Sequence, residues 1–294
     1  MTNVTERTSE PPRLHVRQRA RELYRAREIL WNLVRKELKV KYTASVLGAV
    51  WSLLNPVVFL AVFAFVTRIF KGGITDYPAF LLAGLLAWNL FSVSLSNGAQ
   101  SVIANANLVK KVYFPREILP LGTVGVCLVD FVLQSTVLIV FFVVSGYGFQ
   151  LNVVWLYPFA FVALLLITVA FTMFVAALNV RYRDVQHLIG LAVLVWFWMT
   201  PIVYPYAQVR EKVGDWALLN PLTPIVITMQ RAVWGNHILT IQTKSGPKKL
   251  PAVPDLSQWW YLRNLGIVML VSVVLLFVAF RIFGRLEDNF AENI

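Results

Sequence analysis

The sequence predicts an all-α integral membrane protein with six transmembrane helices, an N-terminal amphipathic interfacial helix and re-entrant helices before the last span. Three observations predict this class. Of the 294 residues, 58% are hydrophobic and 14% are charged, whereas a soluble domain has roughly 25% charged residues. Six apolar runs approach the ~20 residues that cross a bilayer. A basic amphipathic segment precedes the first of these runs.

The N-terminal region divides into a tail and a basic helix. Residues 1–16 contain Thr, Ser, Pro, Glu and Arg, and we expect them to form a disordered tail. Over residues 17–42, apolar residues recur at steps of three and four, and Arg and Lys occupy the other faces. This pattern predicts an amphipathic helix in the headgroup plane. We favour it over a helix packed on a soluble partner, because a membrane span follows at once.

The apolar runs make up a transmembrane domain at residues 43–284. They cover about residues 44–70, 78–103, 118–145, 153–178, 187–204 and 262–283. A further apolar stretch, residues 218–234, is short for a span of ~20 residues and contains two prolines and Arg231. We therefore expect residues 206–236 to form a re-entrant segment before the last span.

The distribution of basic residues predicts the orientation of the chain. If both termini are cytoplasmic, most of the 27 Lys and Arg residues fall on cytoplasmic segments, as the positive-inside rule requires. Residues 285–294 would then be a cytoplasmic tail. The net charge of +12 does not indicate nucleic-acid binding, because the basic segments adjoin the membrane and meet anionic lipid headgroups there.

Sequence motifs for catalysis or metal binding are missing. There is no G-x-x-x-x-G-K-[ST] motif to hold the phosphates of ATP. The three histidines are far apart and the one cysteine, Cys127, lies in an apolar run, so we expect no metal site. The acidic residues outside the helices are isolated. We therefore expect no catalytic residues and no enzyme activity in this chain.

One short charged segment, NANLVKKVYFPREILP at residues 105–120, separates two apolar runs. Its first part can form a short helix that Pro115 ends, because the residue before a proline avoids the helical region. Lys110 and Lys111 have apolar neighbours such as Phe114. We expect these apolar residues to be exposed beside the cations, as a docking contact for another protein. The alternative is an ordinary positive-inside loop.

Four stretches give the sequence a family resemblance. They are VRKELKVKYTASVLGAVWSLLNPV, NANLVKKVYFPREILP, RYRDVQHL and NPLTPIV. Together they resemble the permease subunit of ABC-2 type exporters for polysaccharides, a group that includes O-antigen, teichoic acid and galactan exporters. The resemblance covers the chain beyond about residue 20. Its most specific parts are the YFPRE block at residues 113–117 and the WSLLNP block at residues 51–56.

The resemblance implies an ABC-2 type exporter fold and a working unit of several chains. Two permeases would pair as a homodimer, and each would bind one cytoplasmic ATPase subunit. ATP-Mg would be held by that partner ATPase, with no cofactor on this chain. The first and fifth spans of both copies would face each other around a channel for the substrate, and residues 206–236 would gate its outer side.

Within this scheme, named residues take three roles. Residues 105–117 would form the coupling helix that meets the ATPase, with Asn107, Leu108, Lys110, Lys111, Tyr113, Phe114, Arg116 and Glu117. The substrate path would include Trp51, Asn55, Phe59, Phe63, Asp130, Trp196, Trp198 and Tyr204. The outer gate would include Asn220, Pro221, Pro224 and Arg231.

Two of these assignments have alternatives. Aromatic side chains can stack against the faces of sugar rings, but a single aromatic residue more often faces lipid or packs in a core. Asp130 lies about 18 Å into the third span at ~1.5 Å per residue, where a charge costs roughly 2.5–3.5 kcal/mol. With Gln134 on the same face, it would either line a channel or make hydrogen bonds between helices.

The sequence thus predicts the permease subunit of an ATP-driven exporter that moves a lipid-linked or nascent cell-envelope polysaccharide across the bacterial inner membrane. The first alternative is an ABC-2 exporter of a small lipid or drug, which a narrow apolar channel without lining aromatics would favour. The second is a membrane scaffold or a polyprenyl-dependent glycosyltransferase. The lack of paired carboxylates in the sequence argues against the transferase.

Overall fold

The computed structural model describes residues 16–43, 48, 50–70, 77–111, 114–145, 152–235, 238–243 and 246–286. Residues 1–15 of the predicted N-terminal tail and residues 287–294 of the predicted C-terminal tail lie outside these ranges. The elements in chain order are α1 (Val16–Arg25), α2 (Arg27–Thr43), α3 (Val50–Phe70), α4 (Tyr77–Ala104), α5 (Ala106–Lys111), α6 (Ile118–Ser145), α7 (Leu156–Arg181), α8 (Val185–Met199), α9 (Tyr206–Val213), the 3-10 helix η1 (Gly214–Leu219), α10 (Leu222–Trp234), β1 (Ile238–Thr243), β2 (Gly246–Pro251) and α11 (Gln258–Leu286).

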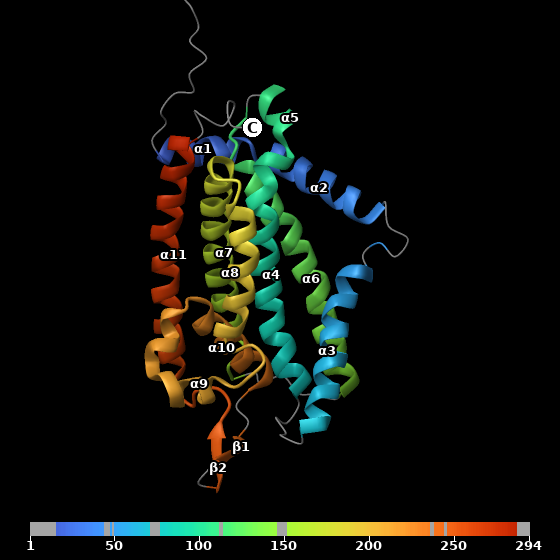
Figure 1. Ribbon diagram of the computed structural model, residues 1–294, viewed down its shortest axis with the longest axis vertical. Coiled ribbons are helices and arrows are strands. Elements are labelled where there is room, and N and C mark those ends of the chain that lie inside the picture. The colour runs from blue at the N-terminus through green and yellow to red at the C-terminus, as the bar shows by residue number, and fades with distance from the viewer. Residues whose placement is uncertain are drawn as a thin grey trace, which may run out of the picture.

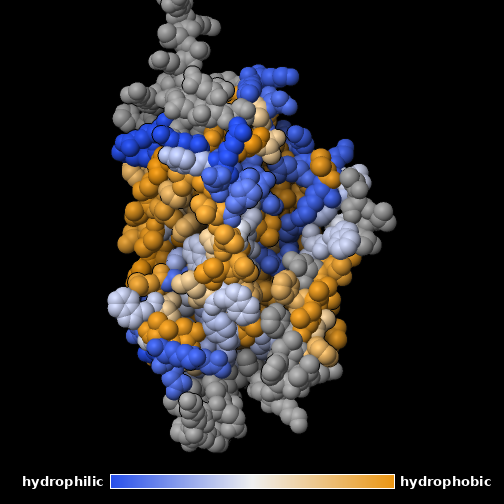
Figure 2. All heavy atoms as spheres, viewed as in Figure 1, coloured by the Kyte–Doolittle hydropathy of each residue, from blue (hydrophilic) through white to orange (hydrophobic). Residues whose placement is uncertain are grey.

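The long helices stand side by side along the longest axis of the molecule (Figure 1). Helices α1, α2 and α5 and the last turns of α11 lie at one end, which we call the α5 end. Helices α9 and α10 and the β1–β2 hairpin lie at the other, which we call the hairpin end. The surface is apolar along the flanks and hydrophilic at the α5 end (Figure 2), as expected of a bundle with lipid at its sides.

Four helices in the described part of the chain are long and apolar enough to cross a membrane: α4, α6, α7 and α11. They correspond to the second, third, fourth and sixth predicted spans, and the third coincides with α6 at both ends. Helix α8 has 15 residues, which at about 1.5 Å per residue is too short to cross a bilayer upright. In α3, which has 21 residues, the apolar stretch is established only over Val50–Phe59, so the first and fifth spans stay predictions.

Helix α4 lies at the centre of the bundle, where it packs against α6, α7 and α10 with most of its side chains buried. Two glycines permit this close approach. A Cβ on Gly98 would overlap the side chain of Thr172 in α7. A Cβ on Gly84 would lie 3.1 Å from the side-chain nitrogen of Gln230 in α10, which donates to the carbonyl of Pro201. The missing side chain at Gly84 thus leaves room for Gln230 of α10 to reach the carbonyl of Pro201.

Asn179 joins three helices near the α5 end, and the sequence analysis did not identify it. Its side chain is fully buried in the last turns of α7. It donates to the carbonyl oxygen of Ala99 in α4 at 2.9 Å and accepts from the backbone N–H of Gln186 in α8 at 3.1 Å. This one amide therefore fixes where α8 begins relative to α4 and α7.

The basic N-terminal segment forms two helices where one continuous helix over residues 17–42 was predicted. Helices α1 and α2 meet at Ala26, which is 8% exposed and packs in a hydrophobic cluster with Leu33. Backbone hydrogen bonds continue on both sides of Ala26, so the junction is a bend, from which α1 extends toward α11 and α2 extends toward α6 (Figure 1).

The hairpin end contains an antiparallel two-stranded sheet that the sequence analysis did not predict. Ile238 pairs with Pro251 and Thr243 pairs with Gly246. The sequence ILTIQT of β1 is rich in β-branched residues, which is a strand signal. The proline and lysines of β2, GPKKLP, obscure the second strand, because proline cannot donate to the ladder.

Helix α2 packs closely on α6 because α6 presents glycines to it. A Cβ on Gly122 would lie 2.8 Å from Leu33 Cδ2, and a Cβ on Gly125 would lie 2.8 Å from Val34 Cγ2. Both α2 side chains are buried. The two glycines are about one helical turn apart, so together they form a shallow strip that receives the apolar face of α2.

We expect Gly125→Val to weaken the packing of α2 on α6, because the new side chain needs the space that Val34 fills. Overpacking of this kind costs about 1–3 kcal/mol, which should lower the midpoint of thermal unfolding in detergent. Gly266→Val in α11 is the control, because no atom of the described chain lies within 4 Å of a Cβ there. Equal midpoints for the two variants would show that this contact does not hold α2.

Candidate functional site

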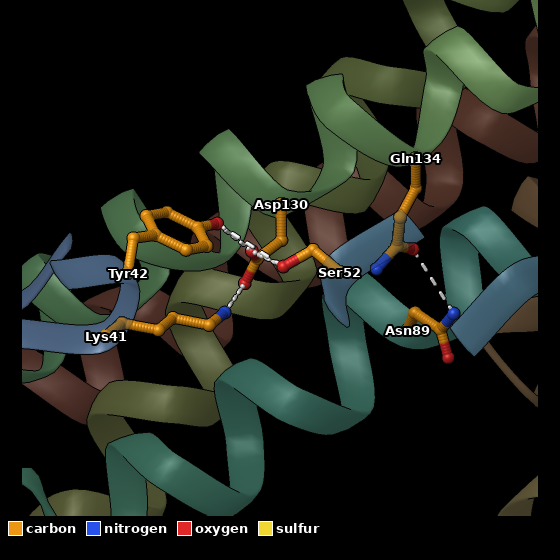
Figure 3. A network of polar contacts seen from close by, with 6 residues as sticks. All are labelled: Lys41, Tyr42, Ser52, Asn89, Asp130 and Gln134. Atoms are coloured by element: carbon orange, nitrogen blue, oxygen red, sulfur yellow. Dashed lines mark hydrogen bonds and ion pairs between the residues drawn. The ribbon is translucent and has the colours of Figure 1, made fainter. Parts of the chain in front are cut away.

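The carboxylate of Asp130 is the centre of a polar network between α2, α3 and α6 (Figure 3). Asp130 lies near the middle of α6 and is 8% exposed. Lys41 Nζ donates to its Oδ2 at 2.5 Å. Tyr42 OH at 2.7 Å and Ser52 Oγ at 2.8 Å donate to its Oδ1. We call these four residues the Asp130 network.

The network joins the end of α2 to the start of α3, the first predicted span. Lys41 and Tyr42 lie in the last turn of α2, and Ser52 lies in the first turn of α3. An ionised carboxylate at this depth needs an opposite charge and further donors, and the network supplies both. Lys41 is 41% exposed, so its ammonium also keeps contact with solvent. The end of α2 and the start of α3 are therefore both tied to α6.

One turn further along α6, Gln134 makes a second polar contact between helices. It accepts from Asn89 Nδ2 of α4 at 3.2 Å and is buried (Figure 3). Asp130 and Gln134 thus make hydrogen bonds between helices, which is one of the two roles considered for them. A role in lining a channel stays a prediction.

The partners of Asp130 were missed from the sequence, although a signal for one of them exists. A buried acid requires a nearby cation, and Lys41 is the basic residue closest to the first apolar run. Nothing in the sequence pattern distinguishes Ser52 or Asn89 from other small polar residues in apolar helices.

The short helix α5 presents a polar and cationic surface at the α5 end. Asn107, Lys110 and Lys111 are exposed, and Leu108 is half-buried. Tyr113, which was also predicted to meet the ATPase, lies outside the described residues.

The prediction that the apolar residues of this segment are exposed is wrong for Val109 and Phe114. They are 7% and 6% exposed and belong to a hydrophobic cluster beneath α5, which we call the elbow cluster. Its members come from α2, α4, α5, α6, α7, α11 and the segments beside them: Ala26, Leu33, Val102, Val109, Phe114, Ile118, Leu119, Ala176, Ala177, Val180 and Phe283. Through Val109 and Phe114, this cluster attaches α5 and the start of the segment before α6 to the bundle. Of the two remaining coupling residues, Arg116 is half-buried and Glu117 is 1% exposed.

The residues predicted for the substrate path do not share one environment. Trp51 of α3 and Trp198 of α8 are 56% and 58% exposed. Phe59 is half-buried against the main core. The side chains of Asn55 and Phe63 lie outside the described part of the chain.

Trp196 packs inside the bundle. Its ring meets Phe91 of α4 and Phe171 of α7 edge to face, with centroids 5.1 and 5.2 Å apart. Its indole Nε1 donates to Asn220 Oδ1 at 2.8 Å. Tyr204 is half-buried and donates to the carbonyl of Trp198. Trp196 is therefore positioned to hold α8 against the core, whereas Trp198 faces outward.

The four residues predicted for the outer gate lie at the hairpin end. Asn220 links α8 to α10: it accepts from Trp196 and from the backbone N–H of Leu222 at 3.1 Å, and it donates to Thr200 Oγ1 at 2.9 Å. Pro221 and Pro224 lie at the start of α10, where proline is tolerated.

Arg231 faces the segment before α11. Its Nη2 lies 3.5 Å from Asp255 Oδ1, and its side chain is 16% exposed. Within the described residues, no cluster of three or more His, Cys, Asp and Glu side chains could hold a metal ion.

The chain is similar to known proteins over most of its length. The family model described as ABC-2 type transporter matches residues 28–234. The O-antigen export system permease protein RfbA of Myxococcus xanthus is 34% identical over 277 residues, which are 93% of this chain and 98% of that protein. Two proteins of the same name from Klebsiella pneumoniae are 29% and 28% identical over 266 residues, which are 90% of this chain and 94% of each protein.

We expect Lys41→Met to destabilise the protein, because it leaves the buried carboxylate of Asp130 without its counter-ion. The loss should be on the order of 2 kcal/mol, below the roughly 3–5 kcal/mol of a fully buried pair, because Lys41 is partly solvated. Adding Asp130→Asn should recover most of this loss in thermal unfolding measurements. Lys39→Met, at an exposed position of α2, is the control. If the double variant is no more stable than Lys41→Met, the ion pair is not what stabilises this junction.

Proposed function

The chain belongs to the ABC-2 type transporter family as a transport subunit, and from that premise we propose that it is the permease of an ATP-driven exporter of an O-antigen-type cell-envelope polysaccharide. The substrate would leave the cytoplasm as a lipid-linked or nascent chain. The observation that carries the proposal is the likeness to a protein named for O-antigen export over 93% of this chain and 98% of that protein, at 34% identity.

Six spans fit this function best, with α3 crossing the membrane beside the four longer helices and α8 crossing it together with the segment that follows to residue 204. Both termini would then lie in the cytoplasm, at the α5 end, in a bacterial inner membrane. The basic helices α1 and α2 and the exposed lysines of α5 support this orientation, because positive charge favours the cytoplasmic side. Helix α10, with 13 residues, is too short to cross, which supports a re-entrant arrangement of residues 206–236.

Two partners follow from the proposed function. A cytoplasmic ATPase, present as two copies, would bind ATP-Mg and dock on the exposed residues Asn107, Lys110 and Lys111 of α5. A second copy of this chain would complete the channel. The exposed faces of α3 and α8 support this arrangement, because Trp51 and Trp198 are more than half exposed within the described chain.

Deleting the gene should deplete the cell-envelope polysaccharide and raise the amount of lipid-linked glycan inside the cell. The reason is that the cell still assembles the lipid-linked glycan but can no longer export it. Extraction of lipid-linked glycan from membranes, with separate labelling of surface glycan, measures both pools. If the surface glycan is unchanged and the cells instead retain small hydrophobic compounds, the exporter of a small lipid or drug becomes the better reading.

Charge reversal on α5 should weaken binding of the ATPase without unfolding the permease. We expect Lys110→Glu with Lys111→Glu to reduce the co-purified ATPase about tenfold, which corresponds to ~1.4 kcal/mol. Both lysines are exposed, so the elbow cluster beneath them stays intact. Lys212→Glu, in α9 at the hairpin end, is the control. An unchanged yield of ATPase with the double variant would place the docking surface elsewhere.

A further inference from the structure

A polar cavity lies beneath α2, between α2, α4 and α6. Its volume is about 350 Å³, at the lower end of the roughly 300–1,000 Å³ typical of small-ligand pockets. Lys41 and Asp130, already joined in the Asp130 network, form part of its wall. The other polar lining residues that matter here are Glu37 of α2 and Asn97 and Gln100 of α4.

The amides of Asn97 and Gln100 are unusual for a membrane-spanning helix. Both lie near the α5 end of α4 and both are exposed, although most of α4 is buried. No hydrogen bond within the described chain engages either amide, whereas the neighbouring Ser101 and Asn105 donate to carbonyls of their own helix. Amide groups left without partners in lipid are costly, so this face requires water, protein or a polar ligand.

The surface around the cavity fits access from the cytoplasmic side of the proposed topology. Figure 2 shows hydrophilic surface reaching from the α5 end down between α4 and α2. A molecule entering along this strip meets amides and carboxylates before it reaches the apolar flank of the bundle. The cavity is thus a polar recess at the level where a lipid-linked headgroup would be presented.

The charges of the lining decide which part of such a substrate fits. Glu37 and Asp130 contribute carboxyl groups, and the single ammonium, that of Lys41, is already bound to Asp130. Burial raises the pKa of Glu37, and the charge of Lys36 opposes this only in part. Because Lys41 and Asp130 neutralise each other, the described lining has no cation left to bind a diphosphate. It suits a neutral ligand rich in hydroxyl groups, because carboxylates accept hydrogen bonds and amides both donate and accept them.

We propose that this cavity is a subsite for a neutral sugar unit of the exported glycan, held by Asn97, Gln100 and Glu37 beneath the interfacial helix. This inference rests on the proposed function. It adds the place where the glycan is first held and the side chains that bind it. The diphosphate of the carrier lipid lies outside the cavity in this scheme.

Photo-crosslinking in cells tests the subsite. The full-length chain carries p-benzoylphenylalanine at Asn97, at Gln100, or at Leu270, an exposed position of α11. After irradiation, the purified permease is stained for glycan. We expect at least fivefold more glycan-positive adduct at positions 97 and 100 than at position 270. Equal adduct at all three positions, or none at 97 and 100, overturns the proposal.

A second strain distinguishes binding of the sugar from binding of the carrier lipid. In cells that make the carrier lipid diphosphate without its glycan, positions 97 and 100 should give no lipid adduct by mass spectrometry. A carrier adduct there would mean that the cavity holds the diphosphate and that the sugar subsite is wrong.

A transport measurement tests the same residues without a bulky label. Asn97→Ala with Gln100→Ala should slow glycan export several-fold, while the amount of permease in the membrane and the co-purified ATPase stay unchanged. Export at the parent rate overturns the subsite but leaves the proposed function intact. The proposed function fails separately, if deletion of the whole gene leaves surface glycan at its normal level.

Discussion

The buried carboxylate of Asp130 imposes the strongest single constraint on how this chain enters the membrane. A charge at mid-helix is tolerated only with a counter-ion and further donors, and here these come from the end of α2 and the start of α3. Helix α2 is therefore not free to move away from the bundle. Its last turn must reach Asp130 of α6, and the glycines at 122 and 125 let the middle of α2, at Leu33 and Val34, pack closely on the same helix. The sloping path of α2 and the cavity beneath it both follow from this one requirement.

Polar side chains also set the positions of the shorter helices. Asn179 holds the start of α8 against α4, and Asn220 ties the end of α8 to the start of α10. Between these two points, the exposed side chains of α8 are mainly apolar. A helix of 15 residues gains little anchoring from length alone, so the buried amide of Asn179 and the half-buried amide of Asn220 take over that role near its two ends. The bundle thus combines apolar packing along its axis with polar attachment at both ends.

Much of the architecture could be predicted from the sequence because long apolar helices leave a strong local signal. The bounds of α6 were predicted in full, since Pro115 and the charges before it end one element and start the next. What could not be predicted depends on contacts between distant residues. The break at Ala26, the burial of Phe114 and the pairing of Lys41 with Asp130 arise only once α2, α5 and α6 are side by side. The hairpin was missed because its second strand contains two prolines and two lysines.

The elbow cluster has a mechanical consequence. Phe114 and Val109 belong to one hydrophobic cluster with side chains from distant parts of the chain, including Ala26 and Phe283. Close-packed interiors are barely compressible, so a push on α5 cannot be absorbed by bending of this short helix. Force applied there is transmitted to α2, α4, α7 and α11, so it would tilt the α5 end of the bundle as a unit instead of bending one loop.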